Sequence, residues 1–86
     1  MKKNLIEIFV EKNCRACDEV LAAAARFFSH PDVDVRIFSR ETDLSVFRER
    51  NIVICPATFV NNRLVFYGNF QTDSLQKYLL KIPLGR

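Results

Sequence analysis

Cys14 and Cys17, two cysteines three positions apart, are the residues whose type and spacing most directly predict chemistry. They follow an apolar run at residues 5–10 and precede a helical pattern that starts at about Asp18. Residues at i and i+3 share one face of a helix, so the two sulfurs should lie within reach of each other. Unpaired N–H groups and the helix dipole favour an anion at a helix N-terminus, which here would be a thiolate. Because thiolates attack disulfides, the pattern predicts thiol–disulfide exchange.

The neighbouring charges distinguish the two sulfurs. Arg15 adds positive charge beside Cys14, and Asp18 should hold Cys17 back as the thiol, so Cys14 is the expected nucleophile. Lys12 and Arg15 are also candidates for steering an anionic partner, although each alone is typical of a solvated surface. The competing interpretation is half of a zinc site. Four zinc ligands would require Cys55 and His30 as well, since the chain offers no other cysteine or histidine.

The elements that position these thiols are expected in the order β-α-β-α-β-β-α. Strands are predicted at residues 5–10, 33–38, 57–60 and 64–67, the second of them at a sheet edge. Helices are predicted at about 16–29, from a cap at Ser39 or Thr42 to Asn51, and at 72–81 with Thr72 as the cap. Asn61-Asn62 predicts a two-residue hairpin turn, because asparagine tolerates positive φ. The expected inward-facing residues are Val20, Leu21, Ala24, Phe27, Phe28, Leu44, Phe47, Leu75, Tyr78, Leu79 and Ile82, with Val46 as a further candidate.

Composition limits the class of protein. The 86 residues, of which 49% are apolar and eight are Phe, suffice for a single domain over residues 1–86. The net charge of +3 comes from dispersed charges, so we expect no nucleic-acid partner. No signal peptide or membrane-spanning run is apparent, and three cysteines do not make a secreted disulfide framework. We therefore expect a cytoplasmic monomer that does not bind membranes.

A CxxC pair follows the first strand, and the X-Pro step Cys55-Pro56 precedes the third. In these features the chain resembles the thioredoxin-fold family, and more narrowly its small glutaredoxin-like members. The resemblance extends over nearly the whole chain, through residues 8–17, 55–60 and 63–68 to Asp73 and Leu75. It implies an α/β thioredoxin-like fold: a four-stranded mixed sheet flanked by three helices, with the first and third strands central and antiparallel to each other. Ile8 stands where thioredoxins keep a buried acidic residue, and no Trp precedes Cys14.

The resemblance also implies roles for single residues. Pro56 would be cis and face the sulfurs, and Cys55 would offer its backbone groups to a substrate chain. Gly68 and Asp73 match part of the glutathione-binding pattern of glutaredoxins. The site residues are then Cys14 and Cys17 for catalysis, and Lys12, Arg15, Cys55, Pro56 and Asp73 for substrate binding. No cofactor is expected beyond the redox-active disulfide, with glutathione or a reductase as electron donor.

Cys55 leaves two interpretations open. Free cysteine is often a small buried apolar side chain. The family geometry would also bring Cys55 against the CxxC pair, as a third thiol. The primary hypothesis is a thiol–disulfide oxidoreductase that acts on a disulfide-bearing protein or a small thiol. The alternative is a metal- or iron–sulfur-binding protein that uses Cys14, Cys17 and Cys55, and a redox-inert interaction module is the third.

Overall fold

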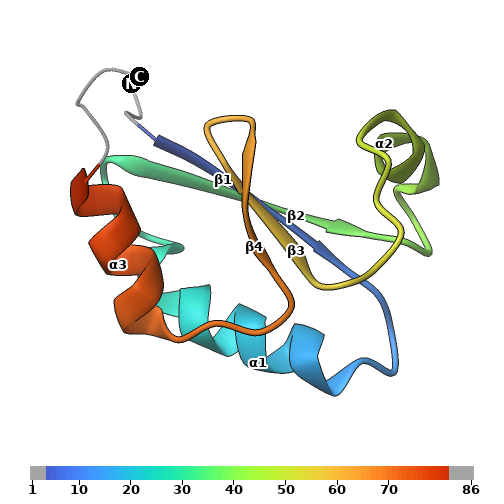
Figure 1. Ribbon diagram of the computed structural model, residues 1–86, viewed down its shortest axis with the longest axis horizontal. Coiled ribbons are helices and arrows are strands. Elements are labelled where there is room, and N and C mark those ends of the chain that lie inside the picture. The colour runs from blue at the N-terminus through green and yellow to red at the C-terminus, as the bar shows by residue number, and fades with distance from the viewer. Residues whose placement is uncertain (1–3, 82–86) are drawn as a thin grey trace.

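The computed structural model describes residues 4–81, which form a four-stranded mixed sheet with helices on both faces (Figure 1). The element order β-α-β-α-β-β-α is the one that the sequence predicted, with a short 3₁₀ helix, η1, added after the first helix. The bounds are β1 Asn4–Val10, α1 Arg15–Ala24, η1 Ala25–Phe27, β2 Val33–Ser39, α2 Leu44–Glu49, β3 Ala57–Val60, β4 Arg63–Tyr67 and α3 Thr72–Lys81.

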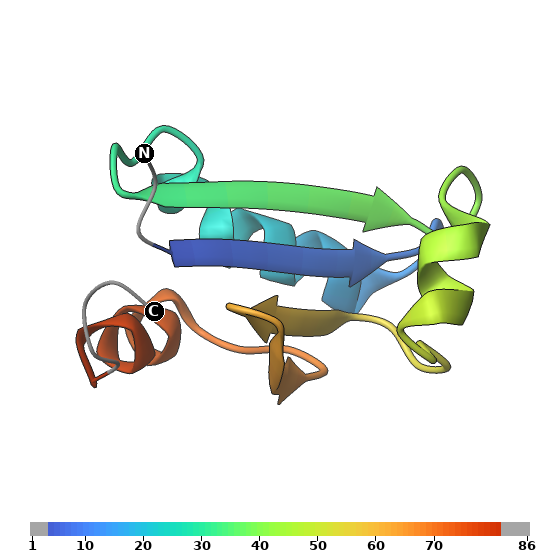
Figure 2. The ribbon, with the colours of Figure 1, turned by 90° about the horizontal axis from the view of Figure 1, so that it is seen from above.

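The strand order β2-β1-β3-β4 confirms that the first and third strands are central and that β2 is at an edge. β1 runs parallel to β2 and antiparallel to β3 (Figure 2). Every residue from Ile6 to Val10 is buried, as expected of a strand covered on both faces. The parallel register sets Val10 opposite Ser39, so the residues that follow β1 and β2 leave the sheet at the same end.

The hairpin between β3 and β4 turns at Asn61 and Asn62, whose φ angles are 52° and 69°. This confirms the predicted asparagine turn. Asn61 also fastens the turn to the first strand: its N–H donates to the Leu5 carbonyl, and its side-chain oxygen accepts from the Leu5 N–H, both at 2.8 Å. The hairpin and the start of β1 are therefore held together by more than the strand ladder.

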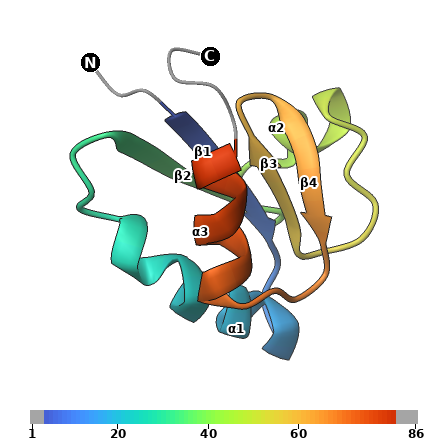
Figure 3. The ribbon, with the colours of Figure 1, turned by 60° about the vertical axis from the view of Figure 1, so that its left-hand side comes forward.

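Helices α1 and α3 cover one face of the sheet (Figure 3). As predicted, Val20, Ala24, Phe27 and Leu75 are buried there, and Leu21, Tyr78 and Leu79 pack against them. Phe28 is exposed, so its predicted burial is wrong: the chain tightens into η1 after Ala24, and the 3₁₀ geometry changes which side chains face the sheet. Ile82 lies outside the described residues.

The start of α3 differs from its predicted form. Thr72 is the first helical residue rather than the cap, and the Gln71 carbonyl accepts from Ser74 and Leu75. The Thr72 hydroxyl instead donates to the Ala23 carbonyl at 2.8 Å. Ala23 is in the last turn of α1, where carbonyl groups lack helical partners, so this bond both satisfies α1 and joins it to α3.

On the opposite face, α2 packs at the end of the sheet where β1 finishes, and it places Phe47 edge-on to Phe9 with ring centroids 5.1 Å apart (Figure 2). The predicted caps Ser39 and Thr42 are wrong, because Asp43 precedes the helix and its carboxylate accepts from the Ser39 N–H. This later start leaves Leu44 exposed, although it was expected to be buried. Asn51 ends the segment with φ 58°, as predicted.

A buried ion pair lies on this same face. The carboxylate of Glu7 accepts from Arg50 Nη2 at 2.8 and 3.0 Å, and the Arg50 guanidinium lies 5.0 Å from the Phe59 ring centroid. Side chains alternate across a strand, so the buried acid Glu7 faces away from Ile8 and from the α1 side of the sheet.

Within residues 4–81, no helix has the length and apolar character needed to cross a membrane.

Candidate active site

Cys14 and Cys17 form a disulfide, with their Cα atoms 5.2 Å apart. Cys14 has extended backbone angles and caps α1, and its sulfur accepts a hydrogen bond from the Cys17 N–H at 3.1 Å. A sulfur in this position meets the N–H groups that have no partner inside the helix. The expected placement of a cysteine at the helix N-terminus, within bonding reach of a second one, is therefore confirmed.

The two sulfurs differ in their access to solvent. Cys17 is 1% exposed and belongs to the core cluster between the sheet and α1, together with Ile6, Ile8 and Val10. Cys14 is only partly buried at the edge of that cluster. A molecule that approaches the disulfide can therefore reach the sulfur of Cys14 but not that of Cys17.

The segment before β3 lies against the same core. The Cys55–Pro56 peptide bond is cis, Pro56 is buried, and its carbonyl accepts from the Gly68 N–H at 2.8 Å. Gly68 has φ 91°, a conformation that favours glycine. Cys55 is partly exposed, and like Cys14 it packs against the core cluster on the α1 side. The structure thus brings Cys14, Cys17, Cys55 and Pro56 to one part of the molecule.

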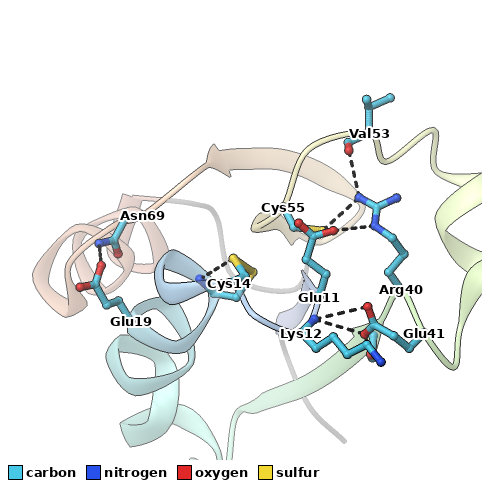
Figure 4. The surroundings of a disulfide bond; sticks show 11 residues. Glu11, Lys12, Cys14, Glu19, Arg40, Glu41, Val53, Cys55 and Asn69 are labelled. Atoms are coloured by element: carbon cyan, nitrogen blue, oxygen red, sulfur yellow. Dashed lines mark hydrogen bonds and ion pairs between the residues drawn. A yellow bond between two sulfur atoms is a disulfide. The ribbon is translucent and has the colours of Figure 1, made fainter.

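Beside the disulfide, Arg40 links three segments of the chain (Figure 4). Its Nε donates to Glu11 at 2.8 Å, and its Nη2 donates to the Val53 carbonyl at 2.9 Å and to the Cys55 sulfur at 3.4 Å. The hydrogen bond with Glu11 is the main cause that raises the pKa of Arg40. Burial raises the pKa of the Cys55 thiol, and the Arg40 guanidinium opposes that change. Cys55 is therefore held mainly as a neutral thiol near neutral pH.

The predicted charged residues are less closely involved. Lys12 is exposed, and its backbone N–H donates to the Glu41 carboxylate at 3.3 Å. Arg15 is 94% exposed at its side chain and pairs with Glu19 at 3.8 Å, so part of its positive charge is compensated. Asp73 is exposed in the first turn of α3, next to Thr72, which contacts the opposite end of α1 from Cys14. The substrate-binding roles of these three residues stay predictions.

Sequence reasoning missed Arg40 and Glu11. Each is the first residue after a strand, and β1 and β2 are parallel neighbours whose last residues, Val10 and Ser39, lie opposite each other. Opposite charges directly after two adjacent parallel strands could have indicated this ion pair. A further missed contact is the hydrogen bond at 2.6 Å from Asn69 to Glu19, which connects the loop after β4 to α1.

The metal hypothesis lacks a suitable set of ligands. Among residues 4–81, no group of three or more His, Cys, Asp or Glu side chains is placed to hold a metal ion. Two of the three cysteines that the hypothesis requires are bonded to each other. The geometry does not support the alternative that Cys14, Cys17 and Cys55 bind a metal or cluster.

Fold and site together define a class: an α/β protein with a redox-active CxxC disulfide at the start of its first helix. Residues 4–80 match the family described as thioredoxin domain, and the chain belongs to that family. It is a thiol–disulfide oxidoreductase, whose redox group is the Cys14–Cys17 pair. A comparison with curated proteins found no match.

Solved structures support the same fold. Mitochondrial thioredoxin 3 of Saccharomyces cerevisiae has a TM-score of 0.75 at 15% identity, over 95% of this chain and 81% of that one. Thioredoxin-2 of the malaria parasite has a TM-score of 0.82 at 13% identity, over 93% and 84% of the two chains. The alkylhydroperoxide reductase AhpF of Enterococcus faecalis has a TM-score of 0.78 at 28% identity, over 92% of this chain and 38% of that one. The predicted thioredoxin-like fold is confirmed.

Proposed function

We propose that Cys14 is the nucleophile and Cys17 the resolving thiol in the reduction of disulfides. The substrate is a protein disulfide or the disulfide form of a small thiol. In the reduced protein, the Cys14 thiolate attacks a partner disulfide, and one partner sulfur leaves and takes up a proton. Cys17 then loses its proton and attacks the Cys14 sulfur, which releases the second partner thiol. The partner gains two electrons, and the protein is left with the Cys14–Cys17 disulfide.

The unequal exposure of the two bonded sulfurs carries this assignment. A partner can contact the half-buried Cys14 sulfur at the N-terminus of α1. Cys17 lies in the core, where the Cys14 sulfur is the one that it can attack. The N–H groups of the first turn of α1 would stabilise the Cys14 thiolate. Buried Cys17 would lack that help, and it would attack only after Cys14 had formed the mixed disulfide.

A disulfide-reduction assay with insulin and a dithiol reductant tests the assignment. We expect Cys14→Ser to lower the rate of insulin reduction by about 100-fold or more, because the attacking thiolate is lost. Cys17→Ser should instead accumulate a mixed disulfide that mass spectrometry locates at Cys14. Equal alkylation rates at the two sulfurs of the reduced protein, or turnover by Cys14→Ser, would contradict the proposed roles.

We infer that the segment at Cys55 and Pro56 receives the substrate chain by strand addition. The partly exposed Cys55 precedes β3, and Pro56 is fixed there by the Gly68 N–H. This geometry favours an extended segment of a protein as the substrate. A cross-link between a photoreactive group at position 55 and the peptide beside the substrate disulfide would support the arrangement, whereas cross-links to unrelated surfaces would oppose it.

The electron donor is proposed to be glutathione or a dedicated reductase. The glutaredoxin-like features that favour glutathione are Gly68 and Asp73. Turnover of the oxidised protein with glutathione and glutathione reductase, compared with NADPH and thioredoxin reductase, decides between the donors. If glutathione binds near Asp73, Asp73→Asn should raise the KM for glutathione without changing turnover by a dithiol.

We propose that the protein acts as a cytoplasmic monomer. The unpaired Cys55 thiol is compatible with a reducing compartment. The sheet edges carry charged residues, among them Asp34 and Arg36 on β2 and Arg63 on β4, which oppose edge-to-edge pairing. Cell fractionation tests the location, and a protein found outside the cytoplasm would refute it. Light scattering tests the monomeric state, and a particle with the mass of two chains would refute that.

A further inference from the structure

Arg40 connects the two segments that flank the active site. Glu11, three residues before Cys14, accepts from its Nε at 2.8 Å. Val53 and Cys55, which lead into Pro56, accept from its Nη2 at 2.9 and 3.4 Å. A planar guanidinium offers donors in fixed directions, so one side chain can hold two segments at a defined separation.

The stem of Arg40 is itself fixed. Its backbone N–H donates to the Val10 carbonyl at 2.9 Å, and its guanidinium lies 5.0 Å from the Phe47 ring centroid. Its side chain is 30% exposed. The guanidinium is thus held between the end of β1 and helix α2, and it can transmit that rigidity to the segment before Pro56.

Between Ile52, which is buried, and Cys55, which packs against the core, this segment has no buried side chain. Val53 is 75% exposed and Ile54 is 59% exposed, so neither buries its side chain in a core. Segments with few buried contacts open at low free-energy cost unless hydrogen bonds hold them. The hydrogen bonds that Arg40 makes to the Val53 carbonyl and to Cys55 therefore carry much of the order of this segment.

We propose that Arg40 is a positioning residue that sets the preference of this oxidoreductase for protein disulfides over small disulfides. The inference rests on the proposed function, in which a substrate chain pairs with the backbone at Cys55. Arg40 contacts neither sulfur of the disulfide bond and takes no part in sulfur exchange. By keeping the backbone at Cys55 ordered before the substrate arrives, it lowers the entropy cost of docking an extended chain. A small disulfide that does not pair with Cys55 has no such requirement.

The matched variants are Arg40→Met, Arg40→Lys and the control Arg36→Met. Methionine keeps much of the length of the side chain without its donors, and lysine keeps the charge without the fork. Arg36 is on the same strand, and its exposed guanidinium pairs only at the surface with Asp34. The assays measure kcat and KM separately for insulin and for hydroxyethyl disulfide, a small uncharged substrate.

We expect both Arg40 variants to lower kcat/KM for insulin about tenfold. The change should be mainly in KM, because the lost contact helps to bind the substrate equally in the ground state and the transition state. Activity on hydroxyethyl disulfide, and the pH profile of Cys14 alkylation, should stay as in the unaltered protein. Arg36→Met should resemble the unaltered protein on both substrates. Glu11→Gln, which retains an oxygen acceptor for Nε, should keep more of the preference for insulin than Glu11→Ala.

The inference and the proposed function fail in different ways. If the unaltered protein reduces neither substrate, the proposed function is wrong and the role of Arg40 falls with it. If the unaltered protein is active but Arg40→Met reduces insulin normally, the positioning role alone is refuted. Equal losses on both substrates, or full rescue by Arg40→Lys, would also refute it, because they indicate a general or purely electrostatic effect. Should Arg40→Met fail to fold, Arg40→Lys and Glu11→Ala provide the same comparison.

Discussion

At the scale of single residues, Cys55 shows how environment sets the behaviour of a thiol. Burial raises the pKa of its thiol, whereas the nearby Arg40 guanidinium lowers it, and burial is the larger effect. Neutral thiols are poor nucleophiles, because the thiolate is the reactive form. Cys55 therefore combines a position next to the reactive disulfide with low reactivity of its own, which would limit unwanted exchange with Cys14.

Cys55 should be slow to alkylate at neutral pH. In the oxidised protein it is the free thiol, since Cys14 and Cys17 are bonded. Because its pKa is raised, we expect the alkylation rate to reach half its maximum at a higher pH than for a cysteine in a short unstructured peptide. Iodoacetamide labelling followed by mass spectrometry over a pH series provides the measurement. Cys55→Ser should take up no label, and a midpoint at or below that of the peptide would contradict the prediction.

The residues that the sequence identified are those with a local signal. Cys14 and Cys17 were found because a strand, a two-thiol loop and a helix follow one another directly, and the Asn61-Asn62 turn because φ preference is a property of single residues. Arg40, Glu11 and Val53 were missed, because their contacts join positions up to 29 residues apart. Such contacts depend on strand register, which the local pattern does not specify.

At the scale of elements, helix ends were harder to predict than helix bodies. Thr72 has the side chain of a cap, yet its hydroxyl donates to Ala23 in α1, and Asp43 replaced the expected caps of α2. A hydroxyl or carboxylate that can satisfy its own helix can equally satisfy a neighbouring one, and tertiary packing decides between them. Phe28 and Leu44 were misplaced because the chain tightens into η1 before Phe28, and because α2 begins one residue later than a cap at Thr42 would place it.

The contact between α1 and α3 should depend on the Thr72 hydroxyl. Thr72→Val keeps the shape of the side chain but removes the donor, and leaves the Ala23 carbonyl without this partner. We expect a loss of about 1 kcal/mol in the free energy of unfolding, measured by urea denaturation. Thr42→Val, at an exposed position, is the control, with a change within about 0.5 kcal/mol. Equal effects of the two substitutions would mean that the hydroxyl does not join the helices.

At the scale of the whole molecule, the sheet separates two clusters of buried side chains. One lies under α1 and α3 and includes Cys17, and the other lies under α2 and includes Phe9 and Phe47. The buried carboxylate of Glu7 belongs to the α2 side, where Arg50 pairs with it. The Cys14–Cys17 disulfide and the buried ion pair therefore lie on opposite faces, so we expect changes at Glu7 and Arg50 to leave the disulfide in place.

Loss of Arg50 should destabilise the fold while the reactivity of the disulfide is kept. Arg50→Met would leave the Glu7 carboxylate, 7% exposed, without its cation. Because Arg50 itself is 28% exposed, we expect a loss of roughly 2–3 kcal/mol, below the usual range for a fully buried pair. Denaturant unfolding, with the exposed Arg48→Met as control, measures the change. A loss under about 1 kcal/mol would show that water compensates for the missing guanidinium.

The burial of Cys17 has a consequence for the order of events in a catalytic cycle. Cys14 is the sulfur of the disulfide that another molecule can reach, so the molecule that supplies electrons and the molecule that consumes them must both react there. They cannot both react at that sulfur at once, so we expect the two half-reactions to alternate in a ping-pong cycle. An excess of the electron donor or of the substrate would then compete with the other for access to Cys14.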